Sequence, residues 1–410
     1  MTKDEGRRAD GAGGQPARDK MHGRERSAEA LLSWYDRNRR ILPWREEPAP
    51  YHVWLSEIML QQTRVEAVKK YYLRFTHVLP DIASLATAPE DVWLKLWEGL
   101  GYYSRVRNLH KAAAMIMEKY GGQMPRTKAE LLSLPGIGDY TASAIASIAF
   151  GECVPAVDGN LLRIFARMTE YEAGIRTETA KTAARRFFAP LMPQERPGDF
   201  NQALMDLGSS VCLPNAVPLC GKCPWAEACL AHMHGTESAF PVPEVKKARK
   251  ISRKTVFVIH YHDKIALRRR PSKGLLAGLY EFPNAEGLLD AEQAAAFVRN
   301  LGFEPLRILP LPPAKHIFTH VEWQMQGVDV LVDETAALSG EHGAEAGAEG
   351  SPVFSGESGR SAGEGGGSAS SAGEGEEKPS AVFMADIAQI NEKYSIPSAF
   401  EAYRRAAVEG

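Results

Sequence analysis

Two short stretches of this sequence combine the residue types needed to hold a phosphate and to act on a sugar. The first, residues 134–142 (Leu-Pro-Gly-Ile-Gly-Asp-Tyr-Thr-Ala), predicts a hairpin turn leading into a helix that Asp139 would cap. Its glycines, Gly136 and Gly138, leave backbone N–H groups open to a phosphate oxygen. The second, residues 157–160 (Val-Asp-Gly-Asn), places one carboxylate at the start of another helix. Together they indicate an enzyme that holds a DNA backbone and does chemistry at a sugar.

Two carboxylates are candidates for this chemistry. Glu57 lies in an apolar helical stretch, residues 54–63 (Trp-Leu-Ser-Glu-Ile-Met-Leu-Gln-Gln-Thr), where burial would raise its pKa as a general acid requires. From spacing alone, an exposed glutamate on the polar side of an amphipathic helix is the favoured interpretation. Asp158 is equally suited to be an N-cap. Cleavage of a glycosidic bond needs such a pair, one acid for the leaving group and one charge for the oxocarbenium ion.

Four of the five cysteines form a cluster with metal-ligand spacing. Cys212, Cys220, Cys223 and Cys229 follow the pattern C-x7-C-x2-C-x5-C, which suits a tetrahedral zinc ion or a 4Fe-4S cluster. A zinc ribbon normally has two C-x2-C knuckles, and only one is present, which favours iron–sulfur. Cys153 stands apart and is expected to be a small core residue. Clustered cysteines without a secretory signal indicate metal ligation in a reducing compartment.

The apolar pattern divides the chain into two ordered regions. Helical spacing predicts an all-α domain first, and short apolar runs at 255–259 and 328–332 predict strands of a following α+β domain, with one helix at 285–302. The predicted boundaries are a disordered tail at 1–25, a helical domain at 26–235, a linker at 236–252, and an α+β domain at 253–405 with a low-complexity insert at 336–379.

The charge of the chain is unevenly distributed. The net charge is −2, but residues 333–377 hold ten acidic residues against the single basic Arg360, so the remainder is net positive. The acidic segment is expected to be a solvated linker. No apolar run is long enough to span a membrane. We therefore expect a cytoplasmic, DNA-associated protein, and we expect it to be a monomer.

The motifs together resemble MutY-type adenine DNA glycosylases of the helix-hairpin-helix superfamily that includes endonuclease III. The resemblance is strong over residues 30–235 and looser over 250–335 and 380–405. It rests on residues 42–45 (Leu-Pro-Trp-Arg), 56–63, 99–103 (Gly-Leu-Gly-Tyr-Tyr), the hairpin, residues 157–160 and the cysteine cluster, whose first gap of seven residues is one longer than the family's usual gap. It implies a helical glycosylase domain with a 4Fe-4S cluster, followed by a Nudix-like α+β domain.

The resemblance also implies an activity and a set of site residues. The enzyme would remove adenine mispaired with 8-oxoguanine, or with guanine, from double-stranded DNA without cutting the strand. Glu57 would protonate adenine N7, Asp158 would stabilise the cationic sugar, and Tyr140 and Asn160 would support these steps. Further residues would bind substrate or DNA: Arg40, Arg45 and Gln202 around the extruded adenine, Gln62 and Tyr102 as wedges in the duplex, and Leu100, Gly136 and Gly138 along the DNA.

The C-terminal part resembles the Nudix-like domain of the same family through residues 270–283. It lacks the Arg-Glu-x-x-Glu-Glu box with which catalytic Nudix hydrolases bind metal, so we expect it to read damage. Phe318, Thr319 and His320 match the loop that recognises 8-oxoguanine, with Thr319 where serine is common.

Three alternatives remain: a glycosylase/lyase, disfavoured because Tyr140 replaces the lysine of lyases; an idle DNA-binding iron–sulfur protein; and a Nudix hydrolase.

Overall fold

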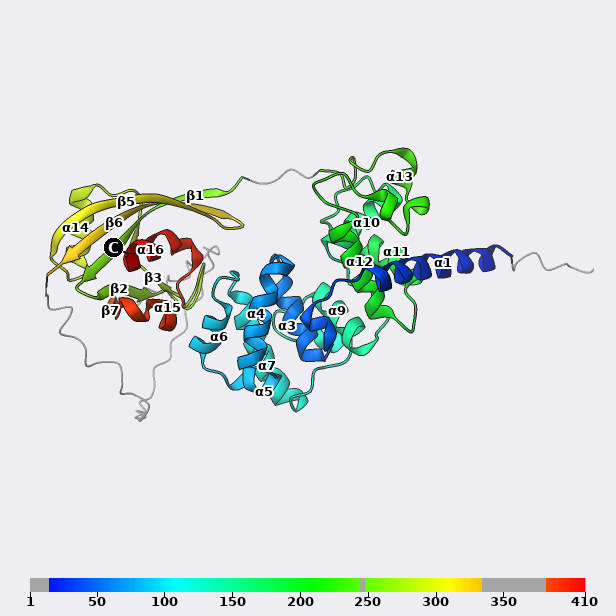
Figure 1. The fold of residues 1–410 in the computed structure, drawn as a ribbon, viewed down its shortest axis with the longest axis horizontal. Coiled ribbons are helices and arrows are strands. Elements are labelled where there is room, and N and C mark those ends of the chain that lie inside the picture. The colour runs from blue at the N-terminus through cyan, green and yellow to red at the C-terminus, as the bar shows by residue number, and fades with distance from the viewer. Residues whose placement is uncertain (1–14, 244–247, 334–380, 410) are drawn as a thin grey trace, which may run out of the picture. The chain divides into compact units, whose positions relative to one another are not determined.

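The computed structural model describes residues 15–243, 248–333 and 381–409. The chain forms two compact units, Met1–Lys247 and Ala248–Gly410, which are described separately (Figure 1). The predicted acidic insert at 336–379 lies outside the described residues. No described helix is both long and apolar enough to cross a membrane.

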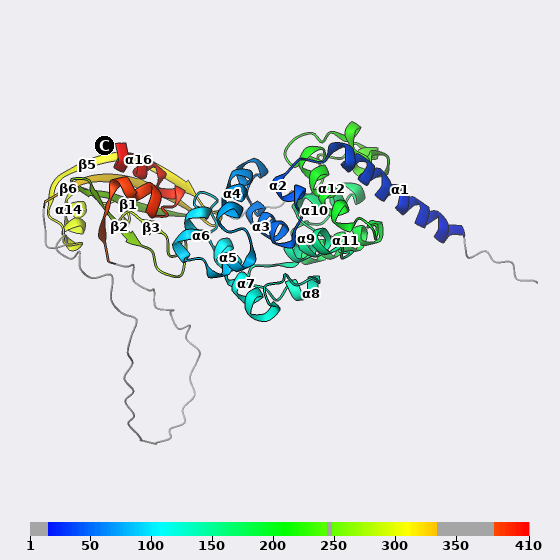
Figure 2. The ribbon, with the colours of Figure 1, turned by 60° about the horizontal axis from the view of Figure 1, so that its bottom comes forward.

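The first unit is helical, as its sequence pattern predicted (Figure 2). Its α-helices are α1 (Gln15–Asn38), α2 (Pro43–Glu46), α3 (Pro50–Leu60), α4 (Val65–Val78), α5 (Ile82–Thr87), α6 (Glu90–Trp97), α7 (Ser104–Tyr120), α8 (Lys128–Leu131), α9 (Asp139–Phe150), α10 (Gly159–Thr169), α11 (Glu178–Phe188), α12 (Pro197–Ser210) and α13 (Leu230–His234); the 3₁₀ turns are η1 (Ala189–Leu191), η2 (Cys220–Lys222) and η3 (Ala226–Ala228).

Both ends of this unit differ from the predicted boundaries. Helix α1 already begins at Gln15, so residues 15–25, predicted as disordered tail, are helical, which suits their Ala, Arg, Lys, Met and Glu content. The predicted linker, 236–252, is also shorter. The Arg167 guanidinium donates to the carbonyls of Glu237 (3.1 Å) and Phe240 (2.9 Å), which ties this segment to the helices. Residues from Lys250 onward pair as a strand.

Two helices bring distant parts of the helical unit together. Helix α3 buries eight of its eleven residues and packs against α9, and α9 in turn packs against α12. Helices α1, α10, α11 and α12 share one apolar core centred on Leu31, Phe188, Phe200 and Leu204. Cys153 packs against this core, although it remains partly exposed. The starts of α9 and α10 therefore lie at the junction between α3 and this core.

The predicted hairpin connects α8 to α9. Gly136 adopts a φ of +77°, and a Cβ atom there would lie 2.6 Å from Cβ of Asn108, so the turn requires glycine for both reasons. The predicted cap is wrong, because Gly138 is the N-cap of α9 and Asp139 is its first residue. The Asp139 carboxylate instead pairs with Lys128 of α8 (2.7 Å) and Arg185 of α11 (2.9 Å), which tie the start of α9 to both helices.

The second unit is a mixed sheet with helices. Its strands are β1 (Lys250–Tyr261), β2 (Lys264–Arg269), β3 (Tyr280–Glu281), β4 (Asn284–Glu286), β5 (Pro305–Ile317), β6 (Val321–Val332) and β7 (Phe383–Asp386), and its helices are α14 (Ala291–Asn300), η4 (Ile387–Gln389), α15 (Ile390–Lys393), η5 (Ser398–Phe400) and α16 (Glu401–Glu409). The strand order is β3-β2-β1-β6-β5, with β1 and β6 parallel, β4 paired with β1, and β7 with β2.

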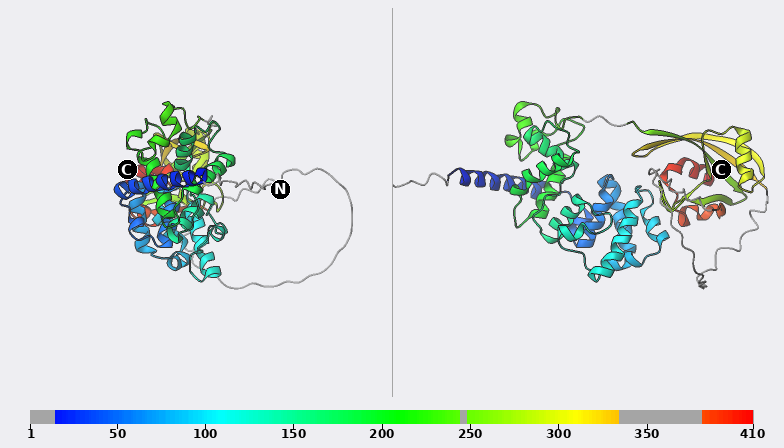
Figure 3. Two further views of the ribbon diagram at one scale, coloured as in Figure 1. Left: turned by 90° about the vertical axis from the view of Figure 1, so that its right-hand side faces the viewer. Right: turned by 180° about the vertical axis from the view of Figure 1, so that it is seen from behind.

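Side-chain alternation along the central strands gives this sheet two buried faces. The ribbon of this sheet and its helices is seen from behind in Figure 3. Val256 and Val258 face the core that contains α15 and α16, whereas Phe257 and Ile259 face the core that contains α14. Helix α14 is shorter than the predicted 285–302 because Asp290 forms a capping box at its start and the preceding residues pair as β4.

Candidate active site

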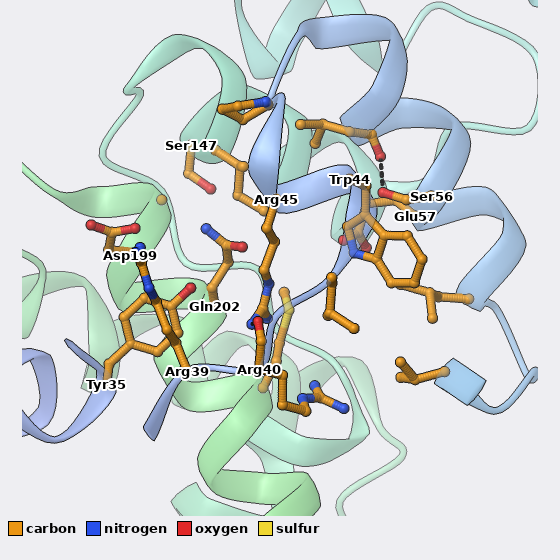
Figure 4. A pocket seen from close by; sticks show the side chains of 18 of the residues that line it. Tyr35, Arg39, Arg40, Trp44, Arg45, Ser56, Glu57, Ser147, Asp199 and Gln202 are labelled. Carbon is orange, nitrogen blue, oxygen red and sulfur yellow. Dashed lines mark hydrogen bonds between the residues drawn. The ribbon is translucent and has the colours of Figure 1, made fainter. Parts of the chain in front are cut away.

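A cavity of about 850 Å³ lies where α1, α2, α3, α9, α10 and α12 meet in the helical unit. Its lining includes the predicted site residues Arg40, Arg45, Glu57, Tyr140, Asp158, Asn160 and Gln202. Figure 4 shows the side chains of Arg45 and Gln202 extending into this cavity. The fold therefore brings together residues that are up to 162 positions apart in the sequence.

Glu57 is buried in the wall of this cavity, with only 6% of its surface exposed. The spacing-based interpretation of an exposed glutamate is therefore wrong, because α3 is covered on nearly all sides. Burial raises the pKa of Glu57 to about 7, and the nearby charge of Asp158 adds to this rise. A 2.7 Å hydrogen bond from the Tyr140 hydroxyl to Oε2, and the charge of Arg45, lower it. Glu57 can thus carry a proton near neutral pH.

Asp158 combines two contacts at the start of α10. Its Oδ1 accepts a 2.8 Å hydrogen bond from the Leu161 backbone N–H, so it is the N-cap of this helix. Its Oδ2 accepts a 2.7 Å bond from Nδ2 of Asn160. Burial raises the pKa of Asp158, whereas these hydrogen bonds and the charge of Arg163 favour the ionised carboxylate. Asp158 therefore caps α10 and lines the cavity with the same side chain.

A third carboxylate, Asp206, was not predicted from the sequence. It is 1% exposed in α12 and pairs with two of the predicted pocket residues. Arg45 donates to both of its oxygens at 2.8 and 3.1 Å, and Arg40 donates through Nε at 2.8 Å. The only signal in the sequence is an aspartate set among Ala203, Leu204 and Leu207. Asp206 fixes both guanidinium groups at one side of the cavity.

Comparison with known proteins agrees with this geometry. Residues 55–190 match the family of HhH-GPD superfamily base excision DNA repair proteins, and residues 255–350 match the NUDIX domain family. The adenine DNA glycosylase of Mus musculus is 35% identical over 372 residues, which cover 77% of this chain and 72% of the mouse protein. The protein of the same name from Buchnera aphidicola subsp. Baizongia pistaciae (strain Bp) is 31% identical, with 76% of this chain and 88% of that protein covered.

The chain belongs to the adenine DNA glycosylase family. The predicted resemblance is confirmed, and the protein is a DNA N-glycosylase of base excision repair with a helix-hairpin-helix unit and a Nudix-like unit. Among solved structures, a thermostable thymine-DNA glycosylase is 28% identical and superposes with a TM-score of 0.47, covering 53% of this chain and 99% of that structure.

Arg105 of α7 connects the C-terminal end of α3, which directly precedes Gln62, with the loop after α6 that holds Tyr102. Its Nη1 donates to the carbonyls of Ile58 (2.8 Å), Met59 (2.9 Å) and Gln61 (2.8 Å). Its Nη2 donates to the carbonyls of Leu100 (3.1 Å) and Gly101 (3.2 Å). Burial lowers the pKa of Arg105 to about 10, so it stays charged at neutral pH. Nothing in the sequence singles out this residue, since its partners are backbone atoms at the end of α3 and in the loop after α6.

The wedge residues themselves are presented on strained backbone. Gln62 and Tyr102 both have positive φ angles, +57° and +47°, which few residues other than glycine adopt. Both side chains are exposed, and the Arg105 guanidinium lies 5.6 Å from the centre of the Tyr102 ring. Leu100 has a buried side chain, its N–H donates to the Trp97 carbonyl at 3.0 Å and its carbonyl accepts from Arg105, so its DNA contact stays a prediction.

The four clustered cysteines line one small cavity beside α10, together with Trp225, His232 and Glu237. Arg167 donates from Nη1 to Sγ of Cys212 at 3.1 Å. Burial raises the pKa of the Cys223 thiol to about 12, and coordination to a metal would deprotonate it. Within the described residues, Cys220, His232 and Glu237 also have ligand atoms within 4.8 Å of one another. The longer first gap thus still allows all four cysteines to line one cavity.

In the Nudix-like unit, Phe318, Thr319 and His320 form the turn between β5 and β6. Thr319 and His320 are exposed, whereas the Phe318 ring packs on Trp323 with ring centres 4.9 Å apart. Phe318 therefore anchors the turn, and the exposed part of the predicted loop is its last two residues. No group of three or more acidic side chains within reach of a common metal ion occurs among the described residues of this unit.

Proposed function

We propose that this glycosylase removes adenine mispaired with 8-oxoguanine, or with guanine, from double-stranded DNA and acts as a monomer. The observation that carries the proposal is the pairing of Glu57, a buried acid with a pKa of about 7, with the carboxylate of Asp158 in one cavity. Residues 26–235 would remove the base, and residues 253–405 would read its oxidised partner through Thr319 and His320, which are exposed on their turn.

The reaction would begin with the adenine extruded from the duplex into the cavity. Glu57 donates its proton to N7, and the C1′–N9 bond breaks with its electron pair leaving on adenine. The Asp158 carboxylate opposes the charge of the resulting sugar cation, and Asn160 orients it through its 2.7 Å hydrogen bond. Water then adds to C1′ and loses a proton, which leaves an abasic site. Arg40, Arg45 and Gln202 contact the edge of the flipped base.

The composition of the cavity supports base removal without strand cleavage. A lyase needs an amine that forms a Schiff base with the sugar. Tyr140 occupies the hairpin position at which lyases carry lysine, and no lysine is among the described residues that line the cavity. Its phenol donates to Glu57 instead.

Three groups of residues would hold the duplex. Gly136 and Gly138 present the backbone of the hairpin to a phosphate, with α9 beginning directly after them. Gln62 and Tyr102 would enter the space left by the extruded base. Leu100 would help to hold the loop of Tyr102 in place, since its side chain is buried and its carbonyl accepts from Arg105.

The cysteine cavity supports a 4Fe-4S cluster held by Cys212, Cys220, Cys223 and Cys229. The four cysteines line this cavity together, and the Arg167 guanidinium donates to Sγ of Cys212. Such a cluster, when bound, would fix the fold of residues 212–229 within the helical unit. Absorbance near 400 nm and iron and sulfide content of the purified protein would test this assignment against zinc.

The experiment that tests the activity uses duplexes with adenine opposite 8-oxoguanine, guanine or thymine, each analysed with and without hot alkali. Breaks that need alkali and are absent for the thymine duplex are expected. Breaks without alkali would overturn the proposal of base removal alone, and equal activity on all three duplexes would overturn the mispair specificity.

A further inference from the structure

An open groove of about 770 Å³ crosses one end of the sheet in the Nudix-like unit. It is lined by the first residues of β1 and β6, by Arg270 and by residues at the end of β4. Four cationic side chains, Lys250, Arg253, Lys254 and Arg270, line it with a single carboxylate, that of Glu286. The groove is therefore net positive, and none of these residues takes part in the base chemistry proposed above.

Two of the cations are held in fixed positions. Arg270 forms an ion pair with Glu281, a carboxylate that is only 1% exposed beneath the groove. Lys254 forms an ion pair with Glu286, so that carboxylate is already neutralised. Both cations also lie against the ring of Trp323, at 5.0 Å for Lys254 and 5.8 Å for Arg270. These contacts hold the two charged side chains in place before any ligand binds.

The other two cations are unpaired within the described part of the chain. Lys250 and Arg253 are exposed, and neither side chain has an ion-pair or hydrogen-bond partner among the described residues. Glu322 of the neighbouring strand pairs with Lys315 at 2.9 Å. The charge of Lys250 and Arg253 is thus available to an anionic ligand.

The groove is continuous with the turn formed by Phe318, Thr319 and His320. The Lys250 N–H donates to the His320 carbonyl at 3.1 Å, and Lys250 pairs with Val321, the first residue after the turn. The first cation of the groove therefore lies beside the turn on the neighbouring strand. Trp323 contacts both features, with the Phe318 ring packed at 68° to its own ring and the two fixed cations against that ring. The turn and the groove form one surface.

We infer that this groove binds phosphates of the DNA strand that carries 8-oxoguanine, next to the base read by Thr319 and His320. The inference rests on the proposed function, because it takes the turn as the damage reader. A row of cations in an open groove suits consecutive phosphates of a strand. A free nucleotide would satisfy the same charges, but the continuity with the turn favours the strand.

The test compares the double variant Lys250→Gln/Arg253→Gln with the control Arg299→Gln/Arg307→Gln. The control removes two exposed arginines of the same unit, on α14 and β5, that do not line the groove. Binding to an A:8-oxoguanine duplex is measured over a range of salt concentrations in the full-length protein. The groove variant is expected to lower the slope of log affinity against log salt by about 2, one for each phosphate that the variant can no longer neutralise. The control should leave the slope unchanged.

A second measurement identifies the strand. Uncharged methylphosphonate linkages beside 8-oxoguanine should weaken binding of the unaltered protein and have no further effect on the groove variant; the same linkages on the adenine strand should weaken both equally. The inference would be overturned if the groove variant left the salt slope unchanged, or if the control lowered the slope equally. It would also be overturned if the groove variant lost binding of free 8-oxo-dGMP while its duplex affinity stayed unchanged. Excision by the unaltered protein distinguishes failure of this inference from failure of the proposed function. If the unaltered protein does not prefer an A:8-oxoguanine duplex to an A:T duplex, the proposed function is refuted.

Discussion

The Tyr140 hydroxyl donates a 2.7 Å hydrogen bond to Oε2 of Glu57, joining the first turn of α9 to the middle of α3. Burial raises the pKa of Tyr140 well above its usual range, so the phenol keeps its proton and remains a donor. Burial raises the pKa of Glu57 to about 7, and this hydrogen bond opposes that rise. The pair therefore sets the pH range in which Glu57 carries a transferable proton.

Replacing Glu57 with Gln should lower the single-turnover rate of adenine removal at least about a hundredfold, because an amide has no proton to transfer to N7. Duplex affinity should change little, since the side chain is buried in the cavity wall. Glu66→Gln, at a side chain that is 81% exposed on α4, is the matched control and should excise normally. Normal excision by Glu57→Gln would remove Glu57 from the mechanism.

The rate of base removal should depend on pH with a maximum below about 7. Above the Glu57 pKa of about 7 the acid loses its proton, so the rate should fall about tenfold per pH unit. Towards acid pH the rate should fall again when Asp158, whose pKa burial raises, takes up a proton and no longer opposes the sugar cation. Single-turnover rates measured between pH 4 and 9 would reveal the acid limb and the alkaline limb of this pH profile. A rate that climbs from pH 7 to 9 contradicts the assignment of Glu57 as the acid.

Replacing Tyr140 with Phe should move the alkaline limb of this profile to higher pH. The hydrogen bond from the phenol stabilises ionised Glu57, so its removal raises the Glu57 pKa further. The same pH series, with Tyr120→Phe as a variant outside the cavity, measures the displacement. A limb that stays in place or moves to lower pH would show that Tyr140 does not tune Glu57.

Local features of the site could be predicted from the sequence. Asp158 caps α10 through the N–H of Leu161, only three residues away, so the residues around it suffice to predict the contact. The hairpin glycine Gly136 was predictable for the same reason, because a turn of this kind needs its positive φ. The motif resemblance added the partners of these residues in the cavity.

Features that depend on distant residues could not be predicted. Asp206 meets Arg45 across 161 residues, and Arg105 meets Ile58 across 47, so neither pairing leaves a periodic signal. Asp139 has the residue type of a cap, yet Lys128 and Arg185 attract its carboxylate and Gly138 caps the helix. The burial of Glu57 likewise depends on helices that pack around α3 from elsewhere in the chain.

Replacing Arg105 with Lys should impair extrusion of the adenine more than folding. Lysine retains the charge but cannot reach the carbonyls at the end of α3 and in the loop after α6 at the same time, so Gln62 and Tyr102 lose their fixed spacing. We expect excision to slow by about ten- to a hundredfold. The fluorescence of 2-aminopurine placed at the adenine position reports unstacking and should increase less on binding. If fluorescence and excision are unaffected, or if thermal unfolding shows that the variant is not folded, Arg105 has no positioning role beyond the fold.

Replacing Asp206 with Asn should shift the alkaline limb in the opposite direction to Tyr140→Phe. The amide keeps the shape of the side chain but removes the charge that offsets Arg40 and Arg45. Arg45 already lowers the pKa of Glu57, and without its carboxylate partner its positive charge acts on Glu57 more strongly. Loss of this buried partner should also cost about 3 kcal/mol of folding free energy. Asp199→Asn, which removes a cavity carboxylate paired with Arg196, is the control. The pH series is measured at a temperature where the variant is folded. An alkaline limb that moves to higher pH would show that Asp206 does not act on Glu57 through Arg45.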